Sequence, residues 1–295
     1  MELVCPAGTP AALRAAVDAG AHTVYCGFAD DTNARNFPGL NFSLEEMAEG
    51  VGYAHARGSK VLVAINTFPR AGAGEIWHRA VANAQVAGAD AVILADLGLL
   101  DYAATHHPDL RRHLSVQAAA ANSDAINFYT ETFGVRRVVL PRVLTVDEIR
   151  AINREIDVET EVFVFGGLCV MAEGRCSLSS YVTGKSPNMN GVCSPASHVV
   201  YSEEADGLRA RLGGFTIHKT PAGHPAPYPT LAKAGVTALK IEGRQRSRAY
   251  VAEVVRTFRV AVEAEAAGQP LPVGVLARLT EGQSATTGAY TKTWR

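Results

Sequence analysis

Short, nearly continuous apolar runs alternate with longer amphipathic segments through most of this 295-residue sequence. Runs such as Lys60–Thr67 and Ala91–Asp96 carry Val, Ile and Leu at consecutive positions. Parallel strands that are buried on both faces have this composition, whereas the longer segments have the periodicity of helices. We expect eight such strands: Glu2–Pro6, Thr23–Gly27, Lys60–Thr67, Ala91–Asp96, His113–Ala118, Arg137–Arg142, Glu161–Gly166 and Ala238–Glu242.

Helices are expected after most of these strands. Eight strands with intervening helices favour an α/β protein with a TIM-like (β/α)8 barrel over an open doubly wound sheet. A barrel of roughly 250 residues plus insertions fits the length of the chain. The expected helices are Thr9–Ala19, Leu44–Ala56, Glu75–Ala87, Leu97–Thr105, Asp124–Phe133, Val146–Glu155 and Arg248–Ala267.

Two segments interrupt the alternation. Residues 167–231 carry three cysteines and many turn residues, and they predict a hairpin around Val199–Tyr201 and Leu208–Leu212. A connection of this length is typical of a functional insertion. We therefore divide the chain into 1–166 with the first seven strands, 167–231 as a cysteine-bearing insertion after strand seven, 232–268 with the last strand and helix, and 269–295 as a C-terminal strap.

Charge and hydropathy exclude several kinds of partner. The net charge is −1, whereas a protein that binds nucleic acid through bulk electrostatics needs a basic excess. No apolar run approaches the ~18 residues of a membrane span, and the first residues lack the features of a signal peptide. We expect a cytoplasmic protein with no membrane span and no nucleic-acid partner.

Three of the five cysteines, Cys169, Cys176 and Cys193, fall in the insertion. In a barrel, this insertion leaves the C-terminal face, where active sites lie. Clustered thiolates suit an iron–sulfur cluster or zinc, although the spacing is not that of a zinc-ribbon pair. The alternative is three unrelated buried thiols. Cys5 and Cys26 lie in predicted strands, where small buried side chains are the expectation.

Polar residues end several predicted strands on the same face of the barrel. Arginine there could bind a carboxylate with two parallel hydrogen bonds, which indicates a site for a ligand with anionic groups. Ordinary helix capping and ion pairing at strand ends is the alternative. The nine histidines include no zinc-protease motif and are expected at the surface. The candidate residues are Asn66, Asp96, Gln117, Arg142 and Glu242 for catalysis, and Asn33, Arg35 and Arg244 for substrate binding.

Several longer motifs resemble a known family. They are ELVCPAG at Glu2–Gly8, DTNAR at Asp31–Arg35, AINT at Ala64–Thr67, EGRC at Glu173–Cys176 and KIEGR at Lys240–Arg244. On these the chain resembles the collagenase-like peptidase family over nearly its whole length. Within that family it is similar to the UbiU branch, on Val139–Leu144, Cys193–Pro195 and Glu242–Ser247.

The resemblance implies a concrete activity. Proteins of this branch pair with a UbiV-like sister protein in a heterodimer, and each partner carries a [4Fe–4S] cluster on four cysteines. Together they support hydroxylation of a ubiquinone precursor without O₂, with prephenate as the proposed oxygen donor. Prephenate is a dicarboxylate, which would suit Arg35, Arg142 or Arg244.

One ligand of that cluster is missing from this sequence. Cys169, Cys176 and Cys193 match three family ligands, and the fourth normally follows a Tyr-Pro-Thr-Leu stretch. Here Tyr228–Leu231 runs directly into Ala232–Gly235 without a cysteine. The explanations are an omitted segment, a deletion, or a cluster held by three thiolates, and we favour an omission or deletion because similarity resumes at once.

The resemblance leaves three other functions open. A peptidase is one, although no Ser-His-Asp, Cys-His or two-His zinc constellation is visible. An RNA hydroxylation protein is another, against which the near-neutral charge counts. The third is a non-catalytic scaffold for the complex, which the missing fourth cysteine keeps open.

Overall fold

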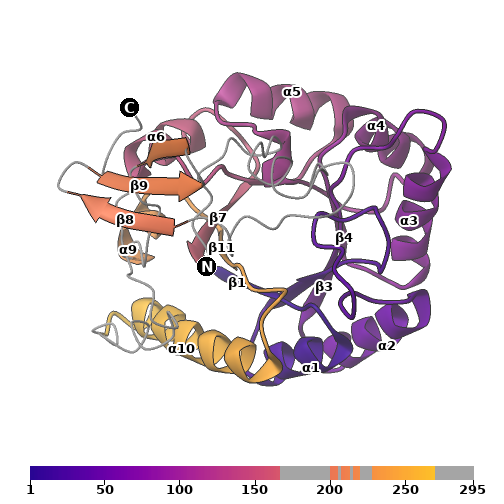
Figure 1. Cartoon of the computed structure of the whole chain (residues 1–295), viewed down its shortest axis with the longest axis horizontal. Coiled ribbons are helices and arrows are strands. Elements are labelled where there is room, and N and C mark those ends of the chain that lie inside the picture. Colours follow the sequence, from indigo (N-terminus) through magenta and orange to yellow (C-terminus); the bar gives the residue numbers. More distant parts are fainter. Residues whose placement is uncertain (167–199, 205–206, 213–214, 220–227, 270–295) are drawn as a thin grey trace.

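A computed structural model describes residues 1–166, 200–204, 207–212, 215–219 and 228–269. Eight parallel strands close into a barrel in the order β1-β11-β7-β6-β5-β4-β3-β2 (Figure 1). The predicted TIM-like barrel is therefore confirmed. The strands are β1 (Glu2–Pro6), β2 (Thr23–Cys26), β3 (Lys60–Ile65), β4 (Ala91–Leu94), β5 (Arg112–Leu114), β6 (Arg137–Val139), β7 (Glu159–Phe165) and β11 (Ala238–Ile241).

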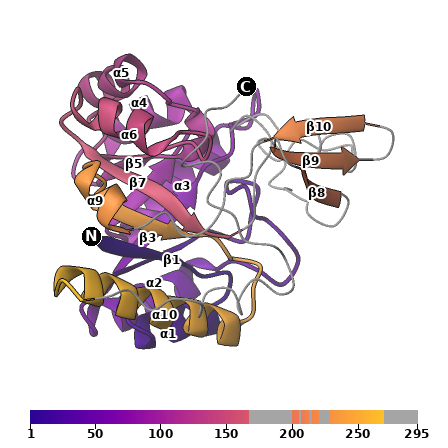
Figure 2. The same cartoon turned by 90° about the vertical axis from the view of Figure 1, so that its left-hand side faces the viewer.

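Helices surround the strands (Figures 1 and 2). They are α1 (Pro10–Asp18), α2 (Leu44–His55), α3 (Glu75–Val86), α4 (Leu97–His106), α5 (Ser123–Phe133), α6 (Val146–Asn153), α9 (Tyr228–Lys233) and α10 (Arg248–Ala266). Two of them, α2 and α6, begin with a capping box, in which Ser43 pairs with Glu46 and Thr145 with Glu148. Among the described residues, no helix combines the length and the hydropathy that crossing a bilayer requires.

The barrel closes where the two ends of the described chain meet. β1 pairs with β11 in parallel, with Glu2 opposite Ala238, and α10 packs against α1 (Figure 1). The outward-facing strand residues, such as Leu3 and Val24, join the helices in one large apolar core. A much smaller apolar cluster fills part of the barrel interior and includes Val4, Tyr25, Leu62, Ala64, Ala91, Ile93 and Ala238. Buried charged side chains, among them Arg137, Glu161 and Lys240, occupy other interior positions.

The fifth strand is shorter than the sequence predicts. β5 ends at Leu114, and Val116–Ala118 form a single 3₁₀ turn, η1, instead of continuing the strand. The Ser115 hydroxyl accepts a hydrogen bond from the Gln117 N–H, which gives that backbone group a local partner in place of a strand neighbour. Ala119 follows with a φ of +54°, which turns the chain away from the barrel wall.

A second sheet lies in the segment between β7 and β11 in the sequence. β8 (Val200–Glu204), β9 (Gly207–Leu212) and β10 (Phe215–Lys219) form an antiparallel sheet in the order β10-β9-β8. The predicted hairpin corresponds to β8 and β9, while β10 was not predicted. The rest of the insertion and the expected strap from 270 onward lie outside the described residues.

Candidate functional site

Two arginines and one glutamate meet at the C-terminal end of the barrel strands. Arg35 follows β2, Arg142 follows β6 and Glu242 follows β11. Glu242 Oε1 lies 2.9 Å from Arg35 Nη2, and its Oε2 lies 3.0 Å from Arg142 Nη2. Burial opposes ionisation of Glu242, but the two guanidinium groups outweigh it and lower the pKa of the carboxyl to about 2. The carboxylate therefore joins three barrel segments at neutral pH.

Glycine makes room for this carboxylate. Gly166, directly after β7, has a φ of +131°, and a Cβ there would lie 2.5 Å from the Cβ of Glu242. The Glu242 N–H donates to the Phe165 carbonyl at 2.7 Å, so the backbone of Glu242 continues the β7–β11 pairing. Any other residue at position 166 would clash with Glu242, so one of the two residues would have to shift.

A third arginine, Arg244, follows Gly243 in the sequence and lies at the same site. Arg244 Nη1 donates to Asn33 Oδ1 at 3.2 Å, and that oxygen also accepts from the Arg35 N–H at 2.9 Å. Asn33 is held in turn by the Phe28 carbonyl. Asn33 and Arg244 are both buried. We call Asn33, Arg35, Arg142, Glu242 and Arg244 the mouth cluster.

Aromatic rings lie beside these cations inside the barrel. The guanidinium carbon of Arg142 lies 3.6 Å from the centre of the Phe163 ring, and Lys240 Nζ lies 3.9 Å from that of Tyr25. The Tyr25 hydroxyl donates to the Ile241 carbonyl at 2.9 Å, which fixes its ring. Ring faces attract cations, so these contacts help to keep buried charges inside the barrel.

Two neutral candidates border the mouth cluster. Asn66 Oδ1 accepts from the Ala34 N–H at 3.0 Å, and its Nδ2 lies 3.4 Å from Ser115 Oγ. Gln117 follows Ser115, and its buried Oε1 has no hydrogen-bond partner among the described residues. Asp96 is separate from this group, because its carboxylate caps α4 by accepting from the Leu99 N–H at 2.8 Å. The structure thus links six of the eight candidates through hydrogen bonds and ion pairs, shows no hydrogen bond from the Gln117 side chain to them, and gives Asp96 a capping role.

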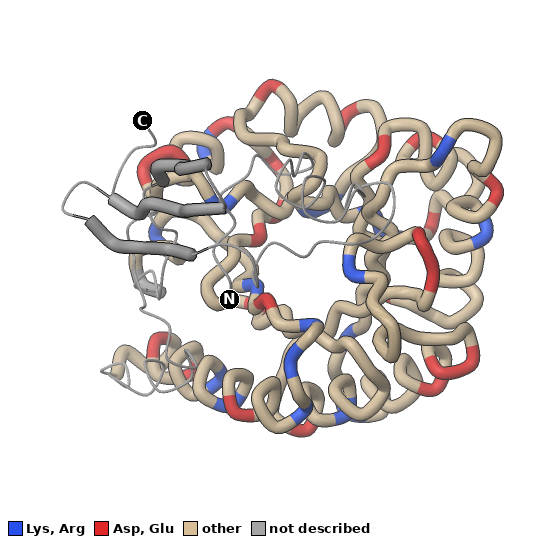
Figure 3. Tube along the Cα trace, in the orientation of Figure 1, with Lys and Arg blue, Asp and Glu red and all other residues tan. Residues whose placement is uncertain are grey.

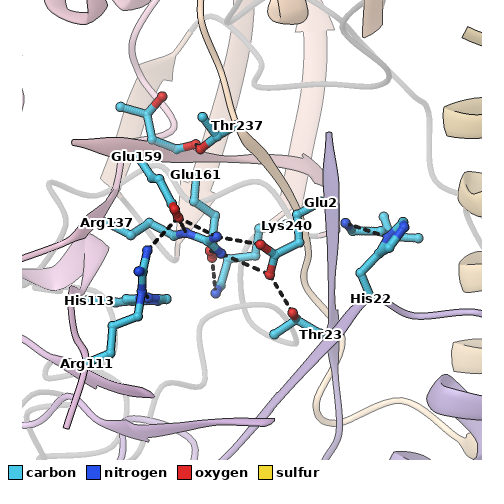
Figure 4. Close-up of polar contacts among 12 residues, drawn as sticks. Glu2, His22, Thr23, Arg111, His113, Arg137, Glu159, Glu161, Thr237 and Lys240 are labelled. Carbon is cyan, nitrogen blue, oxygen red and sulfur yellow. Dashed lines mark hydrogen bonds and ion pairs between the residues drawn. The ribbon is translucent and has the colours of Figure 1, made fainter. Parts of the chain in front are cut away.

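An ion network that the sequence analysis did not predict fills the barrel interior (Figure 4). Arg137 lies 2.5 Å from Glu2, 2.6 Å from Glu159 and 3.3 Å from Glu161. Glu161 also pairs with Lys240 at 2.5 Å. Burial lowers the pKa of Lys240 although Glu161 opposes the shift. We call Glu2, Arg137, Glu159, Glu161 and Lys240 the interior ion network.

The sequence contains a signal for this network. Glu159 and Glu161 are two positions apart on β7 and so face the same side of it, and Lys240 lies two positions after the interior residue Ala238 on β11. His113 lies on the same inner face and corrects the expectation that all histidines are at the surface. It is buried, and its Nε2 accepts from Arg111 Nε at 2.9 Å. Burial and the nearby cations Arg137 and Arg111 hold the pKa of His113 well below its usual range.

The predicted metal ligands Cys169, Cys176 and Cys193 lie outside the described residues. In the part of the chain that is described, no three His, Cys, Asp or Glu side chains are placed to hold a metal ion. Cys5 and Cys26 are free, fully buried thiols, and burial raises the pKa of Cys26 to about 12. Neither thiol is suited to act as a nucleophile, because the reactive form is the thiolate.

Charge on the outer helices is mixed. In Figure 3, acidic and basic positions are scattered around the helical ring. Charged residues of both signs therefore occur around the helical ring, whereas the mouth cluster holds three arginines and one carboxylate.

The sequence matches Peptidase family U32 over residues 8–286. tRNA hydroxylation protein P1 of Bacillus subtilis (strain 168) is 34% identical over 89% of this chain and 63% of that protein. tRNA hydroxylation protein P of Escherichia coli (strain K12) is 31% identical over 94% of this chain and 71% of that protein. The 23S rRNA 5-hydroxycytidine C2501 synthase of the same bacterium is 33% identical over 90% of this chain and 39% of that protein.

These relatives are longer than this chain, which spans less than two thirds of the Bacillus subtilis protein and of the rRNA synthase. All three carry names that refer to hydroxylation. The family match covers most of the sequence, from the turn after β1 to beyond α10. The chain belongs to Peptidase family U32.

Proposed function

We propose that this chain is the iron–sulfur subunit for O₂-independent hydroxylation of a ubiquinone precursor, acting in the cytoplasm with a UbiV-like partner as a heterodimer. One observation carries the proposal. The motifs on which the resemblance to the family and to its UbiU branch rests lie far apart in the sequence, yet their charged residues converge on the mouth cluster. Arg35, Arg142 and Glu242 come from three of these motifs and are joined by ion pairs of 2.9 and 3.0 Å.

The mouth cluster has the chemistry to bind and orient an anionic ligand. Three guanidinium groups and one carboxylate leave an excess of positive charge, and guanidinium binds carboxylates in a defined orientation. A hydroxyl oxygen that does not come from O₂ must come from water or from an organic donor, and we propose prephenate as that donor. Asn66 and Gln117 border the cluster and would contact a polar ring substituent.

A [4Fe–4S] cluster would supply one-electron chemistry to this reaction. We propose Cys169, Cys176 and Cys193 as three of its ligands. Among the cysteines of the described residues, Cys5 and Cys26 do not suit ligation because both are buried inside the apolar core. The fourth ligand is not assigned.

The names of the relatives favour a second candidate function, hydroxylation of a pyrimidine in RNA. The same site would then act on a base that is unstacked from its neighbours, as enzymes that modify bases require. A peptidase function has less support, because the two described thiols are buried and protonated and His113 pairs with an arginine.

The test is to express the chain in a bacterium that lacks its own UbiU-type protein and to grow it without O₂. Ubiquinone and hydroxylated pyrimidine nucleosides are then measured by mass spectrometry. We expect ubiquinone to return with the wild-type chain and not with Arg142→Gln, while Arg150→Gln, at a half-exposed helix position outside the mouth cluster, serves as the matched control. Return of a hydroxylated nucleoside alone would establish the RNA function, and return of neither would contradict a hydroxylation role.

A further inference from the structure

The three arginines of the mouth cluster differ in their counter-ions. Arg35 and Arg142 each pair with one oxygen of Glu242, so a carboxylate of the protein already binds both. Arg244 makes no ion pair with any described residue. Its only hydrogen bond there is to a neutral amide oxygen, Asn33 Oδ1, at 3.2 Å. Arg244 is therefore the cation of this cluster without a bound carboxylate.

The burial of Arg244 makes this arrangement costly. The residue is 6% exposed, and a buried charge without a counter-ion loses hydration that one amide contact does not replace. Burial lowers the pKa of its guanidinium to about 10, which still leaves it charged at neutral pH. The other nitrogens of Arg244 are not among the fully buried, unpartnered atoms of the described residues. The guanidinium nitrogens that do not contact Asn33 have no hydrogen-bond partner among the described residues, so they can donate to a ligand.

Two glycines make space for Arg244. A Cβ on Gly27 would lie 3.0 Å from Arg244 Nη1 and 2.9 Å from Asn33 Cγ. A Cβ on Gly8 would lie 1.8 Å from the Arg244 carbonyl oxygen. Asn33 is fixed by its bonds to Phe28 and Arg35, so the guanidinium is held in one place before any ligand arrives. Preorganisation of this kind is typical of a binding site.

We infer that Arg244 binds the carboxylate of a small-molecule ligand. Arg244 is favoured over Arg35 and Arg142 because those two arginines already pair with the carboxylate of Glu242. A small ligand fits better than the backbone of a nucleic acid, because Asn33 and Arg244 are buried while Arg246 and Arg248 nearby are exposed. The inference rests on the proposed function in that it takes the mouth cluster as the substrate site.

The test measures binding of malonate and of inorganic phosphate to the purified chain by calorimetry, at constant ionic strength. We expect malonate to bind the wild type and to bind Arg244→Gln about tenfold or more weakly, the loss expected for a charge-assisted hydrogen bond. Arg256→Gln, at an exposed position of α10 outside the mouth cluster, is the control and should keep the affinity of the wild type. Glu242→Gln should bind malonate more tightly, because it removes a carboxylate that competes with the ligand for the guanidinium groups of Arg35 and Arg142.

Arg244→Lys provides a variant that keeps the charge while it loses the planar fork, and it should bind malonate with intermediate affinity. Three results would overturn the inference: no malonate binding by the wild type, an equal affinity in Arg244→Gln, or tighter binding of phosphate than of malonate. Binding is independent of hydroxylation, so the two proposals can fail separately. Malonate binding that depends on Arg244 in a chain without hydroxylation activity would contradict the proposed function alone.

Discussion

Arg137 forms ion pairs with three carboxylates inside the barrel. It contacts carboxylates from β1 and from two positions of β7, and its own side chain is 6% exposed. Glu161 is fully buried and would keep only Lys240 as a partner without it. Breaking a buried ion pair from one side leaves an uncompensated charge, which costs much more than the pair contributes.

We therefore expect Arg137→Met to lower the free energy of unfolding by about 3–5 kcal/mol, measured by urea denaturation. Arg256→Met is the control, because Arg256 forms a long, exposed pair with Glu253 at 3.8 Å and should change stability by about 0.5 kcal/mol or less. Equal effects of the two substitutions would show that the interior ion network does not stabilise the barrel.

Glu242 links stability to pH. Its pKa falls from 4.5 to about 2 on folding, so its ionised form stabilises the native state above about pH 4.5. This contribution is lost as the pH falls from 4.5 toward 2. In Glu242→Gln, we expect the loss of stability across that window to be smaller than in the wild type, by at most about 3 kcal/mol. Urea unfolding at a series of pH values measures both curves, and parallel curves would contradict the assigned pKa.

The candidate residues were predictable in part because of where strands end. Arg35, Arg142 and Glu242 follow three parallel strands, and such ends must lie on one face of a barrel. The sequence could not show which polar side chain caps a helix and which does not. Asp96 caps α4, whereas the amide oxygen of Gln117 is buried without a hydrogen-bond partner among the described residues. That choice depends on the path of a few residues after each strand.

At the scale of elements, the start of α2 depends on one serine. The Ser43 hydroxyl accepts from the Glu46 N–H at 3.1 Å, and the Glu46 carboxylate accepts from the Ser43 N–H. We expect Ser43→Ala to cost about 1 kcal/mol in the free energy of unfolding. Glu49→Ala, at an exposed position of the same helix, is the control, and an equal effect would mean that the cap adds nothing.

Strand positions were predicted to within a few residues because burial on both faces leaves a continuous apolar run. The same rule failed for β5, since Val116 is apolar but belongs to a 3₁₀ turn set by Ser115. It also missed β10, whose sequence FTIHK mixes apolar and polar residues and has no clear run. A pattern of hydrophobicity records neither local side-chain hydrogen bonds nor the position of a short strand.

At the scale of the whole molecule, the barrel brings the first and last strands together. The pairing of β1 with β11 sets Arg244 beside Gly8 and Gly27, so the ELVCPAG and KIEGR motifs form one structural unit. Counting strands could predict a barrel, but the partners inside it depend on the register between strands. The interior ion network is the clearest example, because its members come from β1, β6, β7 and β11.

We propose that this member of family U32 is an iron–sulfur hydroxylation protein, and iron content tests this proposal most directly. Iron and acid-labile sulfide are measured per chain in protein purified without O₂, together with Cys176→Ala and Cys26→Ala. Cys26 is the matched control, because its thiol is buried against Met47 and is not a proposed ligand. The account predicts about four iron and four sulfide per chain in the wild type and in Cys26→Ala, and a loss of both in Cys176→Ala. An iron-free wild type, or full iron in Cys176→Ala, would contradict it.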